Sequence, residues 1–157
     1  ALALIDSSIR PEVMHQTGKL HWEQTQALYS AAGVEAQVVP FIDNMGEAYS
    51  WADFAICRAG ALTVAELTCV GLGAILIPFP YAIDDHQTVN AEVFHSAGAA
   101  VLRPQDELDA GQLVADLTKI VEDDEYRKVM SANAASLAVR DAAAKICDVI
   151  SADIISK

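Results

Sequence analysis

Short runs of apolar and β-branched residues alternate along the chain with longer segments in which apolar residues recur every three or four positions. The short runs are typical of strands and the longer segments of helices. The predicted strands are residues 12–16, 36–41, 54–57, 74–78 and 99–102. The predicted helices are residues 19–32, a short helix that Asp43 or Asn44 caps and that ends at Trp51, and residues 61–71, 86–96, 109–122, 124–137 and 141–156.

This alternation predicts βαβ units and a parallel sheet flanked by helices, an α/β fold. The strand from Ala74 to Pro78 is nearly all apolar, as expected of a parallel strand covered on both faces. We expect one domain over residues 1–157 with a helical tail from about residue 105. The first residues, Ala1 to Ile5, suggest the end of a helix whose beginning is absent, so we expect a domain truncated at its N-terminal edge.

Composition and charge exclude several classes of protein. Ten Lys and Arg against 22 Asp and Glu give a net charge of -12, which would repel the phosphates of a nucleic acid. The longest apolar runs fall short of the roughly 18 residues that span a bilayer, and no leader pattern is present. The three cysteines form no C-x-x-C pair and the four histidines no recognisable ligand set. We therefore predict a cytoplasmic protein with reduced thiols, no metal site, no cofactor and no nucleic-acid partner.

Two further features have competing interpretations. The stretch from Asp106 to Glu125 contains eight acidic residues and one basic residue, Lys119. We interpret it as a solvated helical face rather than an acidic docking surface. Cys57 ends a strand, and we interpret it as a small buried hydrophobe rather than a nucleophile.

The candidate site lies where strands end and helices begin, because ligands of parallel α/β sheets bind at that edge. Gly60 and Ala61 leave the first-turn amides of the next helix open to an anion such as a phosphate. The alternative is that small residues merely let the helix pack closely on the sheet. Glu66, one turn beyond Thr63, can accept two hydrogen bonds from a ribose diol, or it can be an ordinary surface residue.

Three other loops at this edge carry weaker signals. Thr17 and Gly18 offer a hydroxyl and backbone amides to a diphosphate. Phe41 and Ile42 can present backbone groups to a flat base, although their composition favours plain core packing. His86, Gln87 and Asn90 can bind sugar hydroxyls, and capping of the helix by Asp84 or Asp85 explains part of that run without a ligand.

Several segments of the chain form a combination of motifs that is specific rather than generic. They are VPFIDNM (39–45), AYSWAD (48–53) and CRAGALTVAE (57–66), with HQTGK (15–19) and IPFP (77–80) extending the set. Together these segments closely resemble one family, the cell-wall glycosyltransferases of family 28. The resemblance is strong over residues 11–103 and loose in the tail. It implies the C-terminal, donor-binding, Rossmann-like half of a two-domain GT-B enzyme, inverting and metal-independent.

The resemblance also implies the reaction. The full-length enzyme would transfer N-acetylglucosamine from UDP-N-acetylglucosamine to lipid I, giving lipid II for peptidoglycan, as a peripheral protein on the inner face of the bacterial membrane. The catalytic base, the acceptor site and the membrane-binding surface would belong to an N-terminal domain, and a Gly-rich loop would precede Ala1. We therefore expect no catalytic residue in this chain and no turnover by the chain alone.

Site roles follow from the same resemblance. The implied substrate-binding residues are Thr17 for the phosphates, Phe41 and Ile42 for the uracil, Ala61, Leu62 and Thr63 for the diphosphate, Glu66 for the ribose, and His86 and Gln87 for the sugar. Gly60 joins them from the turn chemistry described above. The chain departs from the family at Ala59, at His86 and in a longer loop over residues 80–85. These departures affect the sugar contacts.

Three other functions remain as alternatives. The chain can be a stand-alone nucleotide-sugar-binding subunit that needs a separate membrane-bound partner; a coding region extending upstream of Ala1 would instead support the domain of a longer transferase. A nucleotide-sugar epimerase would need catalytic carboxylates and a His in a cleft between domains. A Rossmann-like domain without a ligand would bind no nucleotide.

Overall fold

The computed structural model describes residues 1–81 and 85–155 of the chain. Each predicted strand and helix has a counterpart within a few residues of its expected bounds. The strands are β1 (Met14–Gln16), β2 (Gln37–Val39), β3 (Ala55–Cys57), β4 (Ala74–Leu76) and β5 (Ala100–Leu102). The helices are α1 (Trp22–Ala31), α2 (Met45–Trp51), α3 (Ala61–Val70), α4 (His86–Ser96), α5 (Ala110–Glu122), α6 (Asp124–Ser136) and α7 (Ala142–Ile155). The first residues form a short 3-10 helix, Leu2–Leu4.

The strands pair in parallel, which confirms the α/β fold with parallel sheets flanked by helices. They form two sheets, however, where one was expected. His15 of β1 pairs with Val38 of β2, and Ile75 of β4 pairs with Ile56 of β3 and Val101 of β5. Within the described residues, no ladder joins β1 to β3. Hydrophobic periodicity identifies a strand but carries no information about its neighbour, so sequence could not reveal this division.

The core is built on β4, whose three residues are all buried. Ala74 and Leu76 pack in one cluster with residues of α3, α4 and α6, among them Leu67 and Phe94. Ile75, whose side chain points to the opposite face, packs in a second cluster with Leu117, Ile120 and Met130 of α5 and α6. The uniform apolarity of this strand is therefore explained by helices on both faces.

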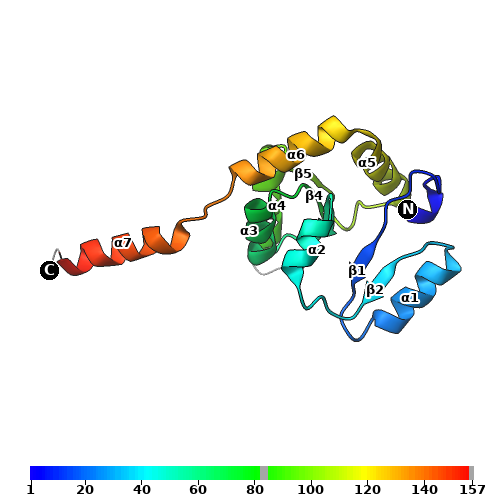
Figure 1. The fold of residues 1–157 in the computed structure, drawn as a ribbon, viewed down its shortest axis with the longest axis horizontal. Coiled ribbons are helices and arrows are strands. Elements are labelled where there is room, and N and C mark those ends of the chain that lie inside the picture. The colour runs from blue at the N-terminus through cyan, green and yellow to red at the C-terminus, as the bar shows by residue number, and fades with distance from the viewer. Residues whose placement is uncertain (82–84, 156–157) are drawn as a thin grey trace.

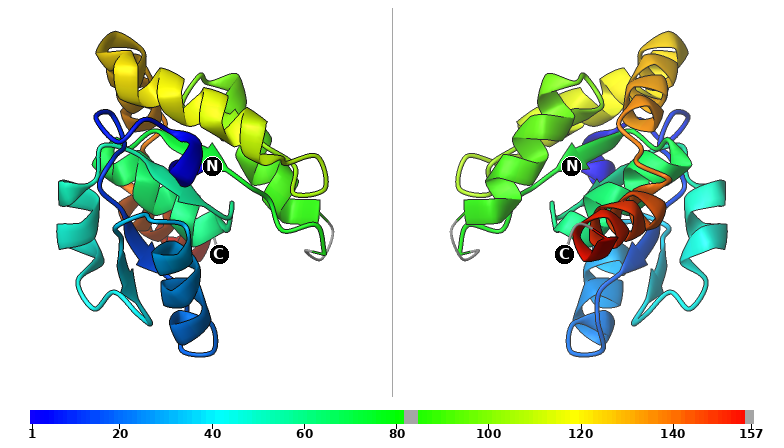
Figure 2. Two further views of the ribbon diagram at one scale, coloured as in Figure 1. Left: turned by 90° about the vertical axis from the view of Figure 1, so that its right-hand side faces the viewer. Right: turned by 90° about the vertical axis from the view of Figure 1, so that its left-hand side faces the viewer.

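The unit of β1, β2 and α1 lies at the opposite end of the molecule from α5 and α6 (Figures 1 and 2). Its residues are mostly half-buried or exposed, and among the described residues of this unit only Val34 is a buried hydrophobic residue. The molecule is therefore packed most densely around the three-stranded sheet.

Glycine ends two of the helices where the sequence predicted an end. Gly71 follows α3 with a φ of 71°, and the amide of Leu72 donates to the carbonyl of Leu67. Gly33 follows α1 with a φ of 63°. Both values lie in the left-handed region, which glycine adopts without the steric cost of a Cβ.

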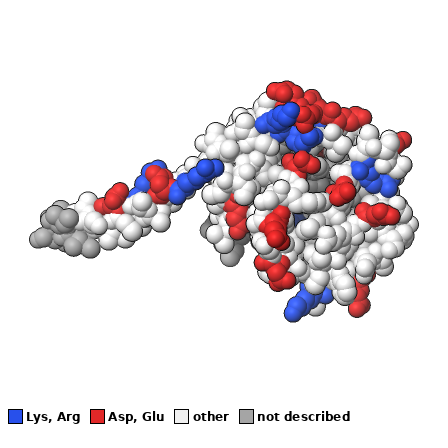
Figure 3. All heavy atoms as spheres, viewed as in Figure 1, with Lys and Arg blue, Asp and Glu red and all other residues white. Residues whose placement is uncertain are grey.

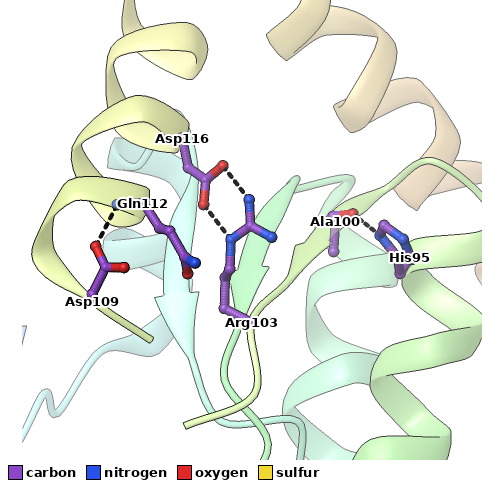
Figure 4. Close-up of polar contacts among 6 residues, drawn as sticks. All are labelled: His95, Ala100, Arg103, Asp109, Gln112 and Asp116. Carbon is purple, nitrogen blue, oxygen red and sulfur yellow. Dashed lines mark hydrogen bonds and ion pairs between the residues drawn. The ribbon is translucent and has the colours of Figure 1, made fainter. Parts of the chain in front are cut away.

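Polar contacts tie β5 to its neighbours (Figure 4). Arg103, which follows β5, donates from Nε and Nη2 to the two carboxylate oxygens of Asp116 on α5, each at 2.7 Å. His95 Nδ1 of α4 lies 2.9 Å from the carbonyl oxygen of Ala100. The side chain of Asp116 is 12% exposed, so this member of the acidic run forms a shielded ion pair.

The rest of the acidic run is mainly a solvated face, as predicted. Glu122, Asp123, Asp124 and Glu125 are all exposed at the corner where α5 meets α6, and acidic side chains gather there in the surface view (Figure 3). Asp123 accepts a hydrogen bond from the amide of Tyr126 and so caps α6. Local capping thus accounts for one acid of this corner.

The last helix, α7, extends away from the body (Figure 1). Ile146, Val149 and Ile150 on it are each more than half exposed. No helix of the described residues is long and apolar enough to cross a membrane.

We expect the substitution Gly73→Ala to destabilise the fold, because α6 approaches the chain closely beside β4. A Cβ at this position would lie 2.8 Å from Cβ of Met130, which cannot move without its backbone. The cost should be about 1–3 kcal/mol of unfolding free energy, measured by urea denaturation.

The matched control is Gly46→Ala in α2, where the new Cβ would meet only Oδ1 of Asn44 at 3.4 Å. Alanine is favoured over glycine in a helix by about 0.5–1 kcal/mol, so this variant should be at least as stable as the parent. Equal stability of the two variants would contradict the close packing of α6 described above.

Candidate functional site

The loops that follow β1 and β2 are joined by hydrogen bonds. The amide of Thr17 donates to the carbonyl of Val39 at 3.0 Å, and the amide of Ile42 donates to Oε1 of Gln16 at 2.8 Å. The hydroxyl of Thr17 lies 3.0 Å from the carbonyl oxygen of Gly18. The structure therefore brings Thr17 and Ile42 to the same edge, with the Ile42 amide engaged by Gln16.

A hollow of about 320 Å³ lies between these strands and α2. Its walls include Phe41, Ile42 and two residues of α2, Ala48 and Trp51. Phe41 is 62% exposed and Trp51 is 48% exposed, so both offer aromatic surface to a ligand. Residues of α3 and α4 do not line this hollow, so the expected site is spread over more than one surface.

The first turn of α3 presents backbone amides without a side-chain cap. Gly60 is the N-cap residue, and in the described part of the chain no side chain accepts from the amides of residues 61–63. Asn44 caps α2 and Asp109 caps α5, each accepting an amide hydrogen bond, whereas α1 and α4 begin, like α3, without a side-chain cap. Open amides and the helix dipole give this terminus a partial positive charge, which suits an anion.

Glu66 lies one turn further along α3 and is held from α2. The hydroxyl of Tyr49 donates to its Oε2 at 2.8 Å. Partial burial and the neighbouring carboxylate raise the pKa of Tyr49 well above its usual value, so the hydroxyl keeps its proton and remains a donor. One carboxylate oxygen of Glu66 is thus engaged by the protein, and α2 connects the hollow to α3.

The first turn of α4, which follows the loop from β4, carries the residues predicted to bind the sugar. Oε1 of Gln87 accepts from the amide of Phe79 at 3.0 Å. Nδ2 of Asn90 donates to the carbonyl of Ala59 at 3.0 Å, which ties α4 to the loop before α3. His86 begins α4, and Asp85 before it has a φ of 51°. Part of the predicted loop, residues 82–84, including Asp84 as a capping candidate, lies outside the described residues.

Cys57 ends β3 beside this edge. Burial raises the pKa of its thiol to about 11, so the neutral thiol dominates near neutral pH. This agrees with a packed thiol and disfavours a nucleophile. Among the residues that the structure describes, no group of three or more His, Cys, Asp or Glu could hold a metal ion.

Residues 2–146 match the family described as "Glycosyltransferase family 28 C-terminal domain". The match extends over most of the chain, so the chain belongs to this family of glycosyltransferase domains. Within the family, it resembles MurG: a crystal structure of Acinetobacter baumannii MurG superimposes with a TM-score of 0.84 at 39% identity, covering 89% of this chain and 42% of that one.

Curated relatives agree with the solved structure. The UDP-N-acetylglucosamine--N-acetylmuramyl-(pentapeptide) pyrophosphoryl-undecaprenol N-acetylglucosamine transferase of Stutzerimonas stutzeri is 52% identical over 149 residues. The protein of the same name from Ectopseudomonas mendocina is 51% identical over 149 residues. Each alignment covers 95% of this chain and 42% of the relative, so the chain spans about two-fifths of these proteins.

Sequence reasoning missed three residues that hold the site together: Gln16, Tyr49 and Arg58. Tyr49 and Glu66 are 17 positions apart on different helices, and Arg58 contacts residues up to 47 positions away. No local spacing pairs such residues. A polar residue directly after a predicted strand, as Arg58 is, was the one available signal.

We expect Cys57 to resist alkylation in the folded protein. At roughly pH 8 a thiol with a pKa near 11 is about one part in a thousand thiolate, whereas an ordinary exposed thiol is about a quarter ionised. Cys69 and Cys147 are exposed and should react first with iodoacetamide, as mapped by mass spectrometry. All three should react in guanidinium, and equal rates in the folded protein would contradict the burial of Cys57.

Proposed function

We propose that the chain is the donor-binding domain of a transferase that moves N-acetylglucosamine from UDP-N-acetylglucosamine to lipid I, giving lipid II. The names of the relatives describe an N-acetylglucosamine transferase of this kind. The observation that carries the proposal is the uncapped first turn of α3 with Glu66 one turn beyond it, held by Tyr49.

The diphosphate would bind at the start of α3, at the amides of Ala61, Leu62 and Thr63, with the backbone of Gly60 close by. Negative charge grows on the diphosphate as the sugar leaves. A helix N-terminus stabilises that charge with fixed dipoles that need no reorganisation. Thr17 would contact the phosphates from the loop after β1.

The nucleoside would bind between α3 and the loop after β2. Glu66 would accept hydrogen bonds from the ribose hydroxyls, and the backbone of Ile42 would read the uracil beside Phe41. Because Gln16 engages the Ile42 amide, a base that uses this amide would replace the side chain of Gln16, one hydrogen bond being exchanged for another.

The transferred sugar would face Gln87 and His86 at the start of α4. Oε1 of Gln87 already accepts from the amide of Phe79, so recognition of the sugar would use the N–H donors of the Gln87 side chain. An amide N–H donor suits the acetamido oxygen of the donor sugar, which is a stronger acceptor than the hydroxyl that glucose carries at the same carbon.

The remaining parts of the reaction are assigned outside this chain. Inverting transfer needs a base that removes the acceptor proton. We infer that this base, the lipid I site and the contact with the inner face of the membrane belong to the part of the relatives that the chain does not match, since the alignments cover 42% of them. The 157 residues would bind the donor without turning it over.

The first test is a calorimetric titration of the chain with UDP-N-acetylglucosamine, UDP-glucose and UDP. We expect saturable binding of all three, and we expect Glu66→Ala to weaken each about 10- to 100-fold through loss of two charge-assisted hydrogen bonds. Glu122→Ala, in the acidic corner far from α3, removes the same charge and should bind as the parent does.

Two results would count against the assignment. Absence of UDP binding at roughly millimolar ligand, a Kd beyond the weak end of specific recognition, would overturn donor binding by this chain. Equal affinity of the parent and Glu66→Ala would overturn the ribose role alone.

A second prediction concerns Tyr49, which fixes the carboxylate of Glu66. Removal of the hydroxyl in Tyr49→Phe should weaken UDP binding about 3- to 10-fold, because the carboxylate loses its orientation. In the Glu66→Ala background the same substitution should cost nothing further, since coupled residues are not additive.

The matched control is Tyr29→Phe. Tyr29 is half-buried like Tyr49, but its hydroxyl lies 3.1 Å from Nδ1 of His15, away from α3. Its loss should leave UDP affinity unchanged. Additive effects of Tyr49→Phe and Glu66→Ala would refute the orienting role.

A further inference from the structure

One arginine side chain joins the loops that follow three neighbouring strands. Arg58 comes directly after β3, and its Nη1 donates to the carbonyls of Ile77 at 3.2 Å and Pro78 at 3.1 Å, both beyond β4. Its Nη2 donates to Oε1 of Gln105, beyond β5. The guanidinium carbon also lies 5.5 Å from the centre of the Phe79 ring. The Arg58 side chain thus links the segments that follow all three strands at the carboxyl edge of the β3–β4–β5 sheet.

The loop that Arg58 holds is the one that orients Gln87. The backbone amide of Phe79 donates to Oε1 of Gln87, so the position of the Phe79 backbone sets the direction of the Gln87 amide. Asn90, one turn along α4, binds the carbonyl of Ala59, the residue after Arg58. Contacts therefore run from Arg58 through Pro78 and Phe79 to Gln87.

The chemistry of these contacts requires an arginine. A guanidinium is planar and presents five N–H donors in a fixed fork, so it can serve two carbonyls and an amide oxygen while lying against an aromatic ring. A lysine keeps the charge but is a compact ammonium on a flexible stem. Among the described residues, no carboxylate forms an ion pair with Arg58, so its contacts are with neutral groups.

We propose that Arg58 is the positioning residue for sugar specificity: by clamping Pro78 and Phe79 it orients the amide of Gln87 toward the sugar of the donor. This inference rests on the proposed donor-binding function and adds Arg58, which acts on the sugar through Gln87. Two contributions at this edge are then distinct. The first turn of α3 and Glu66 provide affinity for the nucleotide, whereas Arg58, acting through Gln87, provides discrimination between sugars.

The test measures two quantities for the parent chain and for Arg58→Lys, Arg58→Ala and Gln87→Ala. The first is the affinity for UDP. The second, the sugar ratio, is the affinity for UDP-N-acetylglucosamine divided by the affinity for UDP-glucose. Arg58→Lys should keep UDP affinity within about twofold while its sugar ratio falls about fivefold, toward one. Gln87→Ala should lower the ratio equally, and the double variant Arg58→Lys/Gln87→Ala should lower it no further.

The control is Arg127→Ala. Arg127 also donates to a backbone carbonyl, that of Ile120, but at the corner of α5 and α6. Its loss should lower the melting temperature without changing the sugar ratio. Arg58→Lys serves as the informative variant where Arg58→Ala fails to fold.

The remaining outcomes would contradict either the positioning role of Arg58 or the proposed donor-binding function. An unchanged ratio in Arg58→Lys, or an equal loss of affinity for UDP and both UDP-sugars, would overturn the positioning role. A parent chain that binds UDP but shows no preference between the sugars would overturn it too and leave nucleotide binding intact. A parent chain that does not bind UDP would overturn the proposed function itself.

Discussion

The burial of β4 on both faces is the constraint on which the rest of the structure depends. Ala74, Ile75 and Leu76 are fully buried and pair with strands on either side, so helices must cover both faces of the sheet. Because the strands are parallel, this packing brings the ends of β3, β4 and β5 to one edge. The apolar core thereby determines where polar chemistry can be placed, although it contributes no polar group itself.

At that edge, and at the ends of β1 and β2 in the other sheet, several polar groups of the candidate site bind one another. The side chain of Gln16 accepts from the amide of Ile42, and the side chain of Gln87 accepts from the amide of Phe79. The hydroxyl of Tyr49 donates to one carboxylate oxygen of Glu66. Such contacts orient the side chains before a ligand arrives, which lowers the entropy lost on binding. The amides at the start of α3 differ, since no described side chain caps them. In the proposed donor complex, such a site would be preorganised where it contacts the nucleoside and the sugar and open where it holds the diphosphate.

Much of this arrangement was predictable from residue patterns. The strand and helix positions, the glycine ends at Gly33 and Gly71, and the buried thiol of Cys57 agree with local expectations. The start of α3 at Ala61 follows from Gly60 and the small residues around it. The division into two sheets was not predictable, nor was the ion pair of Asp116 with Arg103, because each depends on segments that meet only after folding.

By itself, the sequence determined what is local or shared with relatives: element type and approximate bounds, the excess of acidic over basic residues, and membership of the glycosyltransferase family 28 C-terminal domains. Periodicity, turn chemistry and motif identity act over a few neighbouring residues, so they can be read directly from the chain. Only the tertiary structure decided which residues orient the candidate site. Tyr49 meets Glu66, and Arg58 meets Pro78, because separate βα units pack side by side, and hydrogen-bond geometry depends on that packing rather than on distance along the chain.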